Sequence, residues 1–248
     1  MEVDEYFIHF FRLGEPCKIY EMNGGIIMKL IRRIPILFLT CLLIVMSFST
    51  PSSYAQGDTG LLQDIVILPQ GNYDKLEADK MMNHLALIPA PLLQALKDKQ
   101  INIKLVTGKI TDEPEFSQYK GVTPRGWENT GLTWDDVPGV SSNIVIARIG
   151  YSDKGKGHNG QNLELHETLH AIDRLVLGNI SSSSKFTDIW KKEADIDYKG
   201  DGYVSAYATE YFAETATLYL YSEQTQARLK QDMPLTYQFM KDLFSKYQ

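Results

Sequence analysis

The chain has 248 residues, of which 44% are hydrophobic and 23% are charged, and its formal net charge is −6. This composition is typical of a globular protein and excludes a collagen-like repeat, a disulfide-dense miniprotein and a largely disordered chain. The negative charge also argues against a nucleic-acid-binding protein, because such a protein needs a basic face to neutralise phosphates. We therefore expect no nucleic-acid partner.

The N-terminal part of the chain has the pattern of a targeting segment. Residues 34–48 carry no charge, follow a basic stretch and precede small polar residues. This order is typical of a secretory signal peptide, whereas a membrane anchor, the alternative, needs about 20 apolar residues. We expect residues 28–55 to be a signal peptide cleaved after Ala55. The mature protein would then be secreted and extracellular, with no membrane contact.

A signal peptide normally begins close to the initiator methionine, yet residues 1–27 precede Met28. The Gly-Gly pair just before Met28 can be encoded by GGAGGA, which resembles a bacterial ribosome-binding site. We expect translation to start at Met28 and residues 1–27 to be an annotation artefact. Both cysteines precede residue 56, so the predicted mature domain, residues 56–248, contains no thiol.

Three segments with apolar runs or alternation predict β-strands, at residues 63–69, 101–106 and 144–149. Apolar residues at helical spacing predict helices at residues 74–87 and 91–97, the second with proline in its first turn. Residues 108–143 are rich in Gly, Pro, Asp and Trp and are typical of a long ordered loop, with room for a short hairpin.

The C-terminal part has helical periodicity, at residues 163–177, 184–192, 208–222 and 234–247. A few strands followed by several helices predict an α+β fold. We expect a small mixed sheet with helices in the N-terminal part and a mainly helical C-terminal part.

A His-Glu-Thr-Leu-His motif occupies residues 166–170 inside one of these helices. Helix positions i and i+4 lie on one face about 6 Å apart, so His166 and His170 can reach one metal ion. Glu167 lies on the adjoining surface, where it can take a proton from the attacking water. A chance match is the alternative, and the helical context argues against it. The motif predicts one Zn²⁺ ion per chain, with Glu167 as the general base.

A catalytic zinc ion needs a third protein ligand and keeps one open position. Four downstream carboxylates are candidates: Asp173, Glu193, Glu210 and Glu214. Asp173 lies one turn after His170 on the same helix and points along it, which favours an outer partner or a surface charge. Glu193 lies in a charged stretch that is typical of a solvated helix end.

Glu210 and Glu214 are four residues apart in an apolar and aromatic helix. Two carboxylates on one face of such a helix are costly unless they are paired or bind a metal. One of them as a ligand, with the other hydrogen-bonded to a ligand imidazole, satisfies both. An exposed acidic pair on an amphipathic helix is the alternative.

The reaction also needs a group that stabilises the oxyanion, and Tyr203 and Tyr207 precede the helix that carries both glutamates. Either phenol could serve, and a purely structural tyrosine is the alternative for each. On chemistry alone, the chain is predicted to be a secreted zinc hydrolase of the peptidase type.

The sequences of residues 166–173 and 210–214 resemble those of the Pro-Pro endopeptidases, secreted bacterial zinc peptidases related to the catalytic domain of anthrax lethal factor. Further similarity lies at residues 71–75, 120–122, 126–128, 133–139 and 154–158. The resemblance covers nearly all of residues 60–248. It implies a zinc site in the cleft between the N-terminal and C-terminal parts.

The resemblance implies roles for individual residues. Glu210 would be the third zinc ligand, with Glu214 behind it as a partner of the ligands. Tyr203, rather than Tyr207, would stabilise the oxyanion. Trp127 would line the groove that holds the substrate prolines.

Residues 139–144 would form the loop that closes over the peptide, so that further substrate contacts are expected from Ser141, Ser142 and Asn143. Arg125 stands where the family pattern has a lysine, which keeps the charge but changes the hydrogen-bond geometry. His158 could also contact substrate, and a solvated loop histidine is the alternative.

The resemblance implies hydrolysis of the bond between two prolines in a proline-rich peptide or surface protein, by a monomer. Proline lacks an N–H, so its recognition must use ring shape against an aromatic face. A toxin-like protease acting on a host protein is one alternative. A non-catalytic secreted module with structural zinc is another, although such sites usually fill the fourth position with Cys or His.

Overall fold

The computed structural model describes residues 59–124, 127–128, 130–199 and 204–248. Within this part of the chain the helices are α1 (Thr59–Ile65), α2 (Lys75–Leu85), α3 (Ala90–Asp98), α4 (Leu163–Ala171), α5 (Ser184–Asp197), α6 (Ala208–Tyr221), α7 (Glu223–Asp232) and α8 (Pro234–Phe244). The strands are β1 (Val66–Ile67), β2 (Ile103–Val106), β3 (Gly139–Ser141) and β4 (Val145–Arg148). The predicted signal peptide and residues 1–27 lie outside the described residues.

The strands form one four-stranded mixed sheet in the order β1-β2-β4-β3. β1, β2 and β4 are parallel, with Ile103 opposite Val145, while β3 runs antiparallel to β4 with Val140 opposite Ile146. The expected α+β fold with a small mixed sheet is confirmed. β3 and β4 are joined by a tight bend at residues 142–144, so the segment expected to be a closing loop begins as an edge strand.

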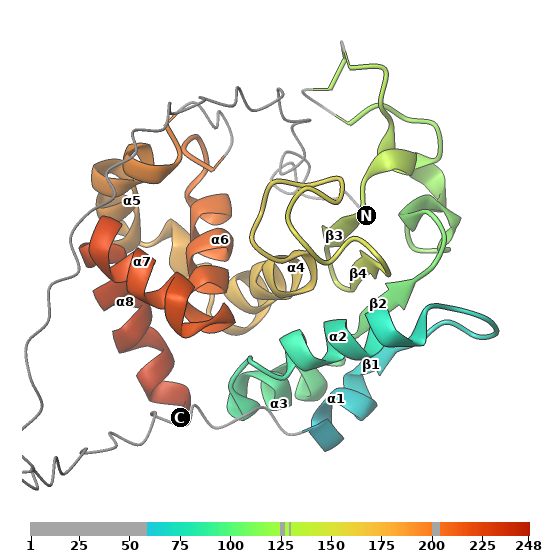
Figure 1. Cartoon of the computed structure of the whole chain (residues 1–248), viewed down its shortest axis with the longest axis horizontal. Helices are drawn as coiled ribbons and strands as arrows, with labels where there is room; N and C mark the ends of the chain where they lie inside the picture. The colour runs from blue at the N-terminus through green and yellow to red at the C-terminus, as the bar shows by residue number, and fades with distance from the viewer. Residues whose placement is uncertain (1–58, 125–126, 129, 200–203) are drawn as a thin grey trace, which may run out of the picture. The chain divides into compact units, whose positions relative to one another are not determined.

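Helix α4 lies between the sheet and the C-terminal helices (Figure 1). It packs against β3 and β4 on one side and against α6 on the other, and all of its residues are buried. Five of its nine residues are nevertheless polar or charged, namely Glu164, His166, Glu167, Thr168 and His170, so these buried side chains need partners inside the protein. A π-helical segment, Ile172–Val176, continues the helix, in agreement with the predicted helix over residues 163–177.

The C-terminal helices pack on one another around α6. α6 contacts α5, α7 and α8, and α5 also contacts α8. Phe186, Phe212 and Phe239 meet in this region, with ring centroids 4.9–5.9 Å from a neighbouring ring. Such aromatic packing buries large apolar areas and supports the two helices on which the site depends.

One predicted strand is much shorter than expected, and one helix was not predicted. Residues 63–69 were expected to form a strand, but the chain is helical as far as Ile65 and only Val66–Ile67 pairs in the sheet. Leu62 and Ile65, three residues apart, are both buried, as on one face of a helix. The continuous apolar run that follows makes this helical spacing hard to recognise in the sequence. Helix α7 was not predicted because Leu229 is its only buried residue.

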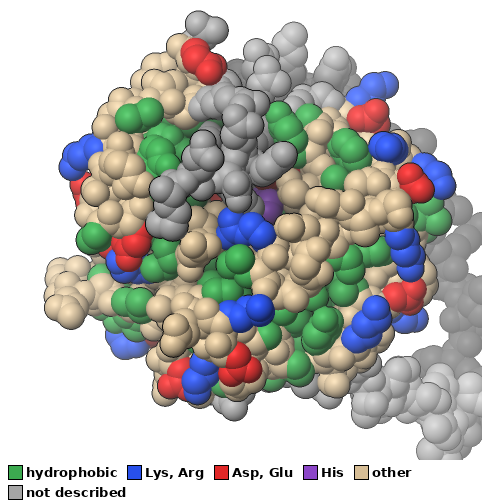
Figure 2. All heavy atoms as spheres, turned by 180° about the vertical axis from the view of Figure 1, so that it is seen from behind, with side chains coloured by type: hydrophobic (Ala, Val, Ile, Leu, Met, Phe, Trp, Pro, Cys, Tyr) green, Lys and Arg blue, Asp and Glu red, His purple; other side chains and the backbone are tan. Residues whose placement is uncertain are grey.

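None of the described helices is long and apolar enough to span a membrane. On the face shown in Figure 2, Lys and Arg side chains lie among Asp and Glu side chains rather than in a patch of one sign.

Candidate metal centre

The start of α4 is fixed by buried polar side chains. Asn162 is its N-cap, and the Asn162 side chain accepts a hydrogen bond from the Leu165 N–H at 2.9 Å. Glu164, fully buried in the first turn, has its Oε1 2.6 Å from His84 Nδ1, 2.8 Å from Ser152 Oγ and 2.9 Å from Asn162 Nδ2. These contacts join α4 to α2 and to the preceding loop, and thereby set the position of the motif two residues later.

Helix α6 brings a carboxylate to the same place from a distant part of the chain. Its residues from Glu210 to Leu220 are all buried. The buried hydroxyls of Thr215 and Thr217 donate to the carbonyls of Tyr211 and Ala213, four residues earlier, so they need no partner outside the helix. Because these hydroxyls are hydrogen-bonded within the helix, α6 can be buried in the protein with Glu210 facing α4.

Three donor atoms converge between α4 and α6. His166 Nε2 and His170 Nε2 are 2.9 Å apart, and Glu210 Oε2 lies 3.2 Å from the first and 3.4 Å from the second. Glu210 Oε1 has no hydrogen-bond partner among the described residues. The structure therefore brings together the three residues expected to bind the metal, all of them buried.

This donor set fits a divalent transition-metal ion. Two imidazole nitrogens and a carboxylate oxygen point their lone pairs at one centre, which is unfavourable unless a cation or proton lies between them. Bonds of about 2.0–2.2 Å in a tetrahedral arrangement place ligand atoms about 3.3 Å apart, close to the observed separations. Zn²⁺ and other divalent first-row transition-metal ions bind imidazole and carboxylate ligands.

The local charges give these groups opposite protonation tendencies in the metal-free protein. Burial disfavours the charged form of His166, but hydrogen bonds to Glu210 and Glu214 outweigh burial and raise the pKa of His166 to about 10. Burial also opposes the ionised form of Glu210, but the charge of His170 and hydrogen bonds from both histidines lower its pKa to about 2. Burial lowers the pKa of His170, against the attraction of Glu210.

Glu167 lies beside the three donors but is not one of them. Its side chain is 2% exposed, and its Oε2 has no hydrogen-bond partner in the described part of the chain. Burial, with the charge of Glu210 added and that of His166 opposing, raises the pKa of Glu167 to about 8. A carboxyl group with a raised pKa next to a metal site can both take and return a proton near neutral pH.

Glu214 lies behind the donor set. It accepts a hydrogen bond from the Gln161 backbone N–H at 3.0 Å, and its Oε2 is 3.5 Å from His166 Nδ1. The far nitrogen of the ligand histidine thus faces a carboxylate, which orients the ring and increases its basicity.

The other two candidate carboxylates do not reach the site. Asp173 is buried and accepts hydrogen bonds from the N–H and hydroxyl of Ser181. Glu193 is also buried, which corrects the expectation of a solvated helix end. Its carboxylate accepts hydrogen bonds from Leu235 N–H, Thr236 N–H and the Thr236 hydroxyl at 2.8–2.9 Å, at the start of α8.

The expected substrate residues have different environments. Trp127 is 5% exposed and Ser141 is fully buried in β3, whereas Ser142 is half-buried and Asn143 is exposed in the bend after it. The role of each in substrate binding stays a prediction. Arg125 and Tyr203 lie outside the described residues, and their predicted roles also stay predictions.

His158 was expected either to contact substrate or to be a solvated loop histidine, and the second alternative is wrong. The side chain is 2% exposed, and its Nε2 lies 2.7 Å from the Tyr151 carbonyl oxygen, to which it donates. Burial lowers the pKa of His158, which favours the neutral ring. Contact with substrate stays a prediction.

Sequence reasoning missed the residues that hold α4 in place, namely His84, Ser152, Asn162 and Glu164. Asn162 had a recognisable pattern, because asparagine before an apolar helix is a preferred N-cap. The contact between His84 and Glu164 joins residues 80 positions apart and has no local pattern.

Comparisons with known proteins agree with this geometry. The family model described as "Anthrax toxin lethal factor, N- and C-terminal domain" matches residues 54–243. A Pro-Pro endopeptidase from Paenibacillus alvei is 55% identical over 218 residues, which cover 88% of this chain and all of that protein. A Pro-Pro endopeptidase from Clostridioides difficile is 48% identical over 192 residues, 77% of this chain and 87% of that protein.

A solved structure of the Pro-Pro endopeptidase from Paenibacillus alvei superposes with a TM-score of 0.73 at 60% identity, covering 74% of this chain and all of that one. Identity of this extent over a shared fold, together with the two histidines and the glutamate gathered between α4 and α6, leads to one conclusion: the chain belongs to the Pro-Pro endopeptidase family and is a peptide hydrolase of the metalloprotease class.

Proposed function

We propose that this protein is a secreted zinc endopeptidase that hydrolyses the bond between two consecutive prolines in bacterial surface or extracellular proteins. The observation that carries the proposal is the convergence of His166, His170 and Glu210 beside the buried Glu167, in a chain whose curated relatives are Pro-Pro endopeptidases. The signal-peptide pattern of residues 28–55 supports secretion.

Zinc is the metal that best suits this donor set. The two histidines are separated by one helical turn and the glutamate comes from another helix, an arrangement with three protein ligands that leaves a coordination position open. His166, His170 and Glu210 would hold the ion. When bound, zinc supplies a Lewis acid that polarises the scissile carbonyl and stabilises the negative charge that develops on it.

Glu167 performs the proton transfers in this proposal. In the metal-free protein its burial raises the pKa of Glu167 to about 8, so this carboxyl group can accept a proton. It takes a proton from the attacking water and delivers it to the nitrogen of the leaving proline. That transfer is necessary because the proline nitrogen leaves as an amine and needs a proton as the peptide bond breaks.

Tyr203 would donate a hydrogen bond to the oxygen of the tetrahedral intermediate, the role that the family pattern implies for it. Recognition of the two prolines would come from ring shape against an aromatic face. The residues expected to contact the substrate are Trp127, Arg125, Ser141, Ser142, Asn143 and His158. A polyproline segment is stiff before it binds, which reduces the entropic cost of ordering it.

The proposal is tested with a library of quenched peptides that carry a central Pro-Pro pair, with the metal content of the purified protein measured by elemental analysis. We expect about one zinc ion per chain and cleavage between the prolines, abolished by a chelator and restored by zinc. Glu167→Gln should lower kcat by about 10²–10⁴-fold, since it removes the general base but no metal ligand. Glu223→Gln, on the exposed face of α7, is the matched control and should leave kcat unchanged.

Two results would contradict the proposal. Folded, zinc-loaded protein that cleaves no Pro-Pro peptide would reject the specificity. Activity that survives in Glu167→Gln at the level of the control would reject the assigned general base.

A further inference from the structure

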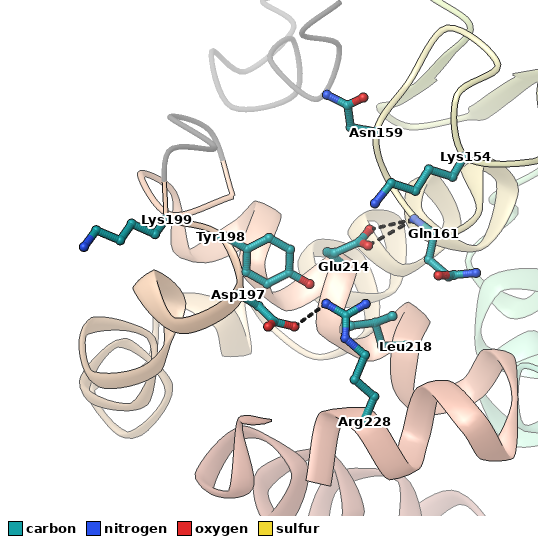
Figure 3. A pocket seen from close by; sticks show the side chains of 9 residues that line it. All are labelled: Lys154, Asn159, Gln161, Asp197, Tyr198, Lys199, Glu214, Leu218 and Arg228. Carbon is teal, nitrogen blue, oxygen red and sulfur yellow. Dashed lines mark hydrogen bonds and ion pairs between the residues drawn. The ribbon is translucent and has the colours of Figure 1, made fainter. Parts of the chain in front are cut away.

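A cavity of about 310 Å³ borders Glu214, the partner of His166 (Figure 3). It is lined by residues from the loop before α4, the end of α5, α6 and α7: Lys154, Asn159, Gln161, Asp197, Tyr198, Lys199, Glu214, Leu218 and Arg228. Its volume is at the small end of the range for ligand sites, about 300–1,000 Å³. Eight of these nine side chains are polar or charged, so an apolar ligand would fit the lining poorly.

The two carboxylates of the cavity already have partners. Asp197 accepts a hydrogen bond from Arg228 Nη2 at 2.6 Å. Glu214 accepts one from the Gln161 N–H and faces His166 Nδ1. Neither carboxylate needs a further cation to satisfy it.

The donors of the cavity are less well satisfied. Lys154 extends toward Glu214 in Figure 3 but forms no ion pair or hydrogen bond within the part of the chain that the structure describes. The Tyr198 hydroxyl points toward the same space and also has no hydrogen bond to a described residue. Arg228 has more contacts: its Nη2 is bonded to Asp197 and its Nε lies 3.6 Å from Asp232 Oδ2, while the guanidinium group borders the cavity. Lys199 extends away from this centre.

The Tyr198 hydroxyl keeps its proton at all ordinary pH values. Burial, with the nearby Glu214 charge added, holds the pKa of Tyr198 well above its usual range. Its ring meets that of Tyr211 edge to face at 5.9 Å, which fixes the direction of the hydroxyl. The cavity therefore combines a flexible ammonium group, a planar guanidinium group and an oriented neutral O–H donor.

We propose that this cavity binds a small free oxyanion of the phosphate type, held by Lys154, Tyr198 and Arg228. An oxyanion offers several acceptor oxygens to three converging donors, and charge-assisted hydrogen bonds from Lys and Arg are the usual means of binding one. The ligand would join three segments, the loop before α4, the end of α5 and α7, next to the residue that supports His166. The inference concerns binding and does not depend on the proposed peptidase specificity.

The test is thermal unfolding of the full-length protein with inorganic phosphate, referenced to chloride at equal ionic strength and performed on both metal-free and metal-loaded protein. A ligand that binds only the folded state at 1 mM affinity should raise Tm by about 3–6 °C at 10 mM phosphate. Isothermal titration of phosphate should give a saturable curve with one site per chain.

Matched variants locate the site. Lys154→Gln and Tyr198→Phe should each abolish most of the phosphate-dependent rise in Tm. Lys156→Gln, another exposed lysine of the same loop that does not line the cavity, should retain all of it. Each substitution removes one polar end and leaves the backbone contacts of the loop intact, so the variants are expected to fold.

The proposal is overturned by any of three results: no saturable effect of phosphate, an equal loss in Lys154→Gln and Lys156→Gln, or a rise in Tm that survives in Lys154→Gln and Tyr198→Phe. The last result would place the anion elsewhere, for example at the metal site. It would leave the assignment of the metal ligands and of the peptidase activity untouched.

Discussion

Two buried glutamates at the metal centre have pKa values that are shifted in opposite directions. Glu210 accepts from both His166 and His170, and its pKa falls to about 2. Glu167 receives no such hydrogen bond from a described residue, and burial raises its pKa to about 8. Hydrogen bonding to the charged form decides the first case and desolvation the second. The same residue type thus supplies a permanent anion for the metal and a base that can change its protonation.

The protonation of His166 leads to a prediction about metal binding. With a pKa of about 10, His166 of the metal-free protein carries a proton at pH 7. A metal ion needs the neutral ring, so its binding must release that proton, and metal affinity should fall as the pH is lowered. Titration calorimetry at pH 7 in two buffers of different ionisation enthalpy should show at least one proton released per ion. An enthalpy independent of the buffer would contradict this prediction.

The raised pKa of His166 also sets how the stability of the metal-free protein depends on pH. A pKa raised from 6.5 to about 10 stabilises the folded state fully below pH 6.5. This contribution is lost as the pH rises through about 10. Urea unfolding of chelator-treated protein should therefore show a falling midpoint between pH 7 and pH 10. Bound metal removes the proton, so the metal-loaded protein should lack this part of the decline.

Glu193 gives a prediction about stability rather than activity. Its carboxylate accepts three hydrogen bonds from the first turn of α8, in a site that is 4% exposed. Glu193→Ala would leave the buried N–H of Thr236 without a partner, and should lower the free energy of unfolding by about 1–3 kcal/mol. Urea unfolding followed by circular dichroism measures this. Lys192→Ala, on the exposed side of the same helix, should change little; equal effects of the two would show that the cap contributes nothing.

At the scale of elements, β3 approaches α4 more closely than a side chain would allow. A Cβ on Gly139 would lie 2.8 Å from Leu163 Cδ1 and 3.1 Å from Glu167 Cγ. Real Cβ atoms do not come so close to other carbons, so the strand, the leucine or the glutamate would have to move. The glycine therefore permits the edge strand to lie directly on the helix turn that carries Glu167.

Gly139→Ala should accordingly impair catalysis. A displacement of the general base by a fraction of an ångström should lower kcat by about 10–100-fold, with the metal content unchanged. Adding Leu163→Val removes the Cδ1 atom of the closest contact and should restore part of kcat. Gly108→Ala, where a new Cβ would meet only the flexible carboxylate of Asp112 at 3.2 Å, is the matched control. A kcat of Gly139→Ala equal to that of the control would reject the role of this close approach.

The elements that could be predicted from the sequence are those with a local pattern. The alternation in residues 101–106 predicts a strand and the helical periodicity of residues 74–87 predicts a helix, and the structure has β2 and α2 there. The motif at residues 166–170 gave two of the three converging donors, because its geometry is contained in one helical turn. The apolar surroundings of Glu210 and Glu214 distinguish them from the other two candidate carboxylates. The resemblance then indicates Glu210, rather than Glu214, as the third ligand.

Other features could not be predicted because they depend on tertiary contacts. The burial of Glu193 comes from α8, which starts about forty residues later, and nothing in the charged stretch around it indicates this partner. His158 is buried and bonded to the Tyr151 carbonyl seven residues earlier, and the glycine-rich stretch around it gives no local sign of this contact. Helix α7 has one buried residue and is held by its neighbours α6 and α8 rather than by its own periodicity.

At the scale of the whole described fold, the metal donors come from two different parts, the sheet with α4 and the group of C-terminal helices with α6. His166 and His170 belong to α4, which packs on the sheet, whereas Glu210 belongs to α6, which packs on the C-terminal helices. The contact between His166 and Glu210 joins residues 44 positions apart. An ion held by all three would therefore act as a cross-link between these parts, as well as supplying the Lewis acid.

Removal of the metal should then lower the stability of the entire fold. Metal at a free concentration 1,000-fold above its Kd adds about 4 kcal/mol, equivalent to a Tm higher by about 8–16 °C in a domain of this size. Differential scanning calorimetry with and without a chelator measures the difference. Glu167→Gln keeps all three donors and should show the same loss on chelation, whereas Glu210→Gln should have a low Tm that the chelator hardly changes. Both variants lose a buried carboxylate, but only Glu210→Gln loses a metal donor. Equal changes in Tm on chelation would therefore show that Glu210 does not bind the metal.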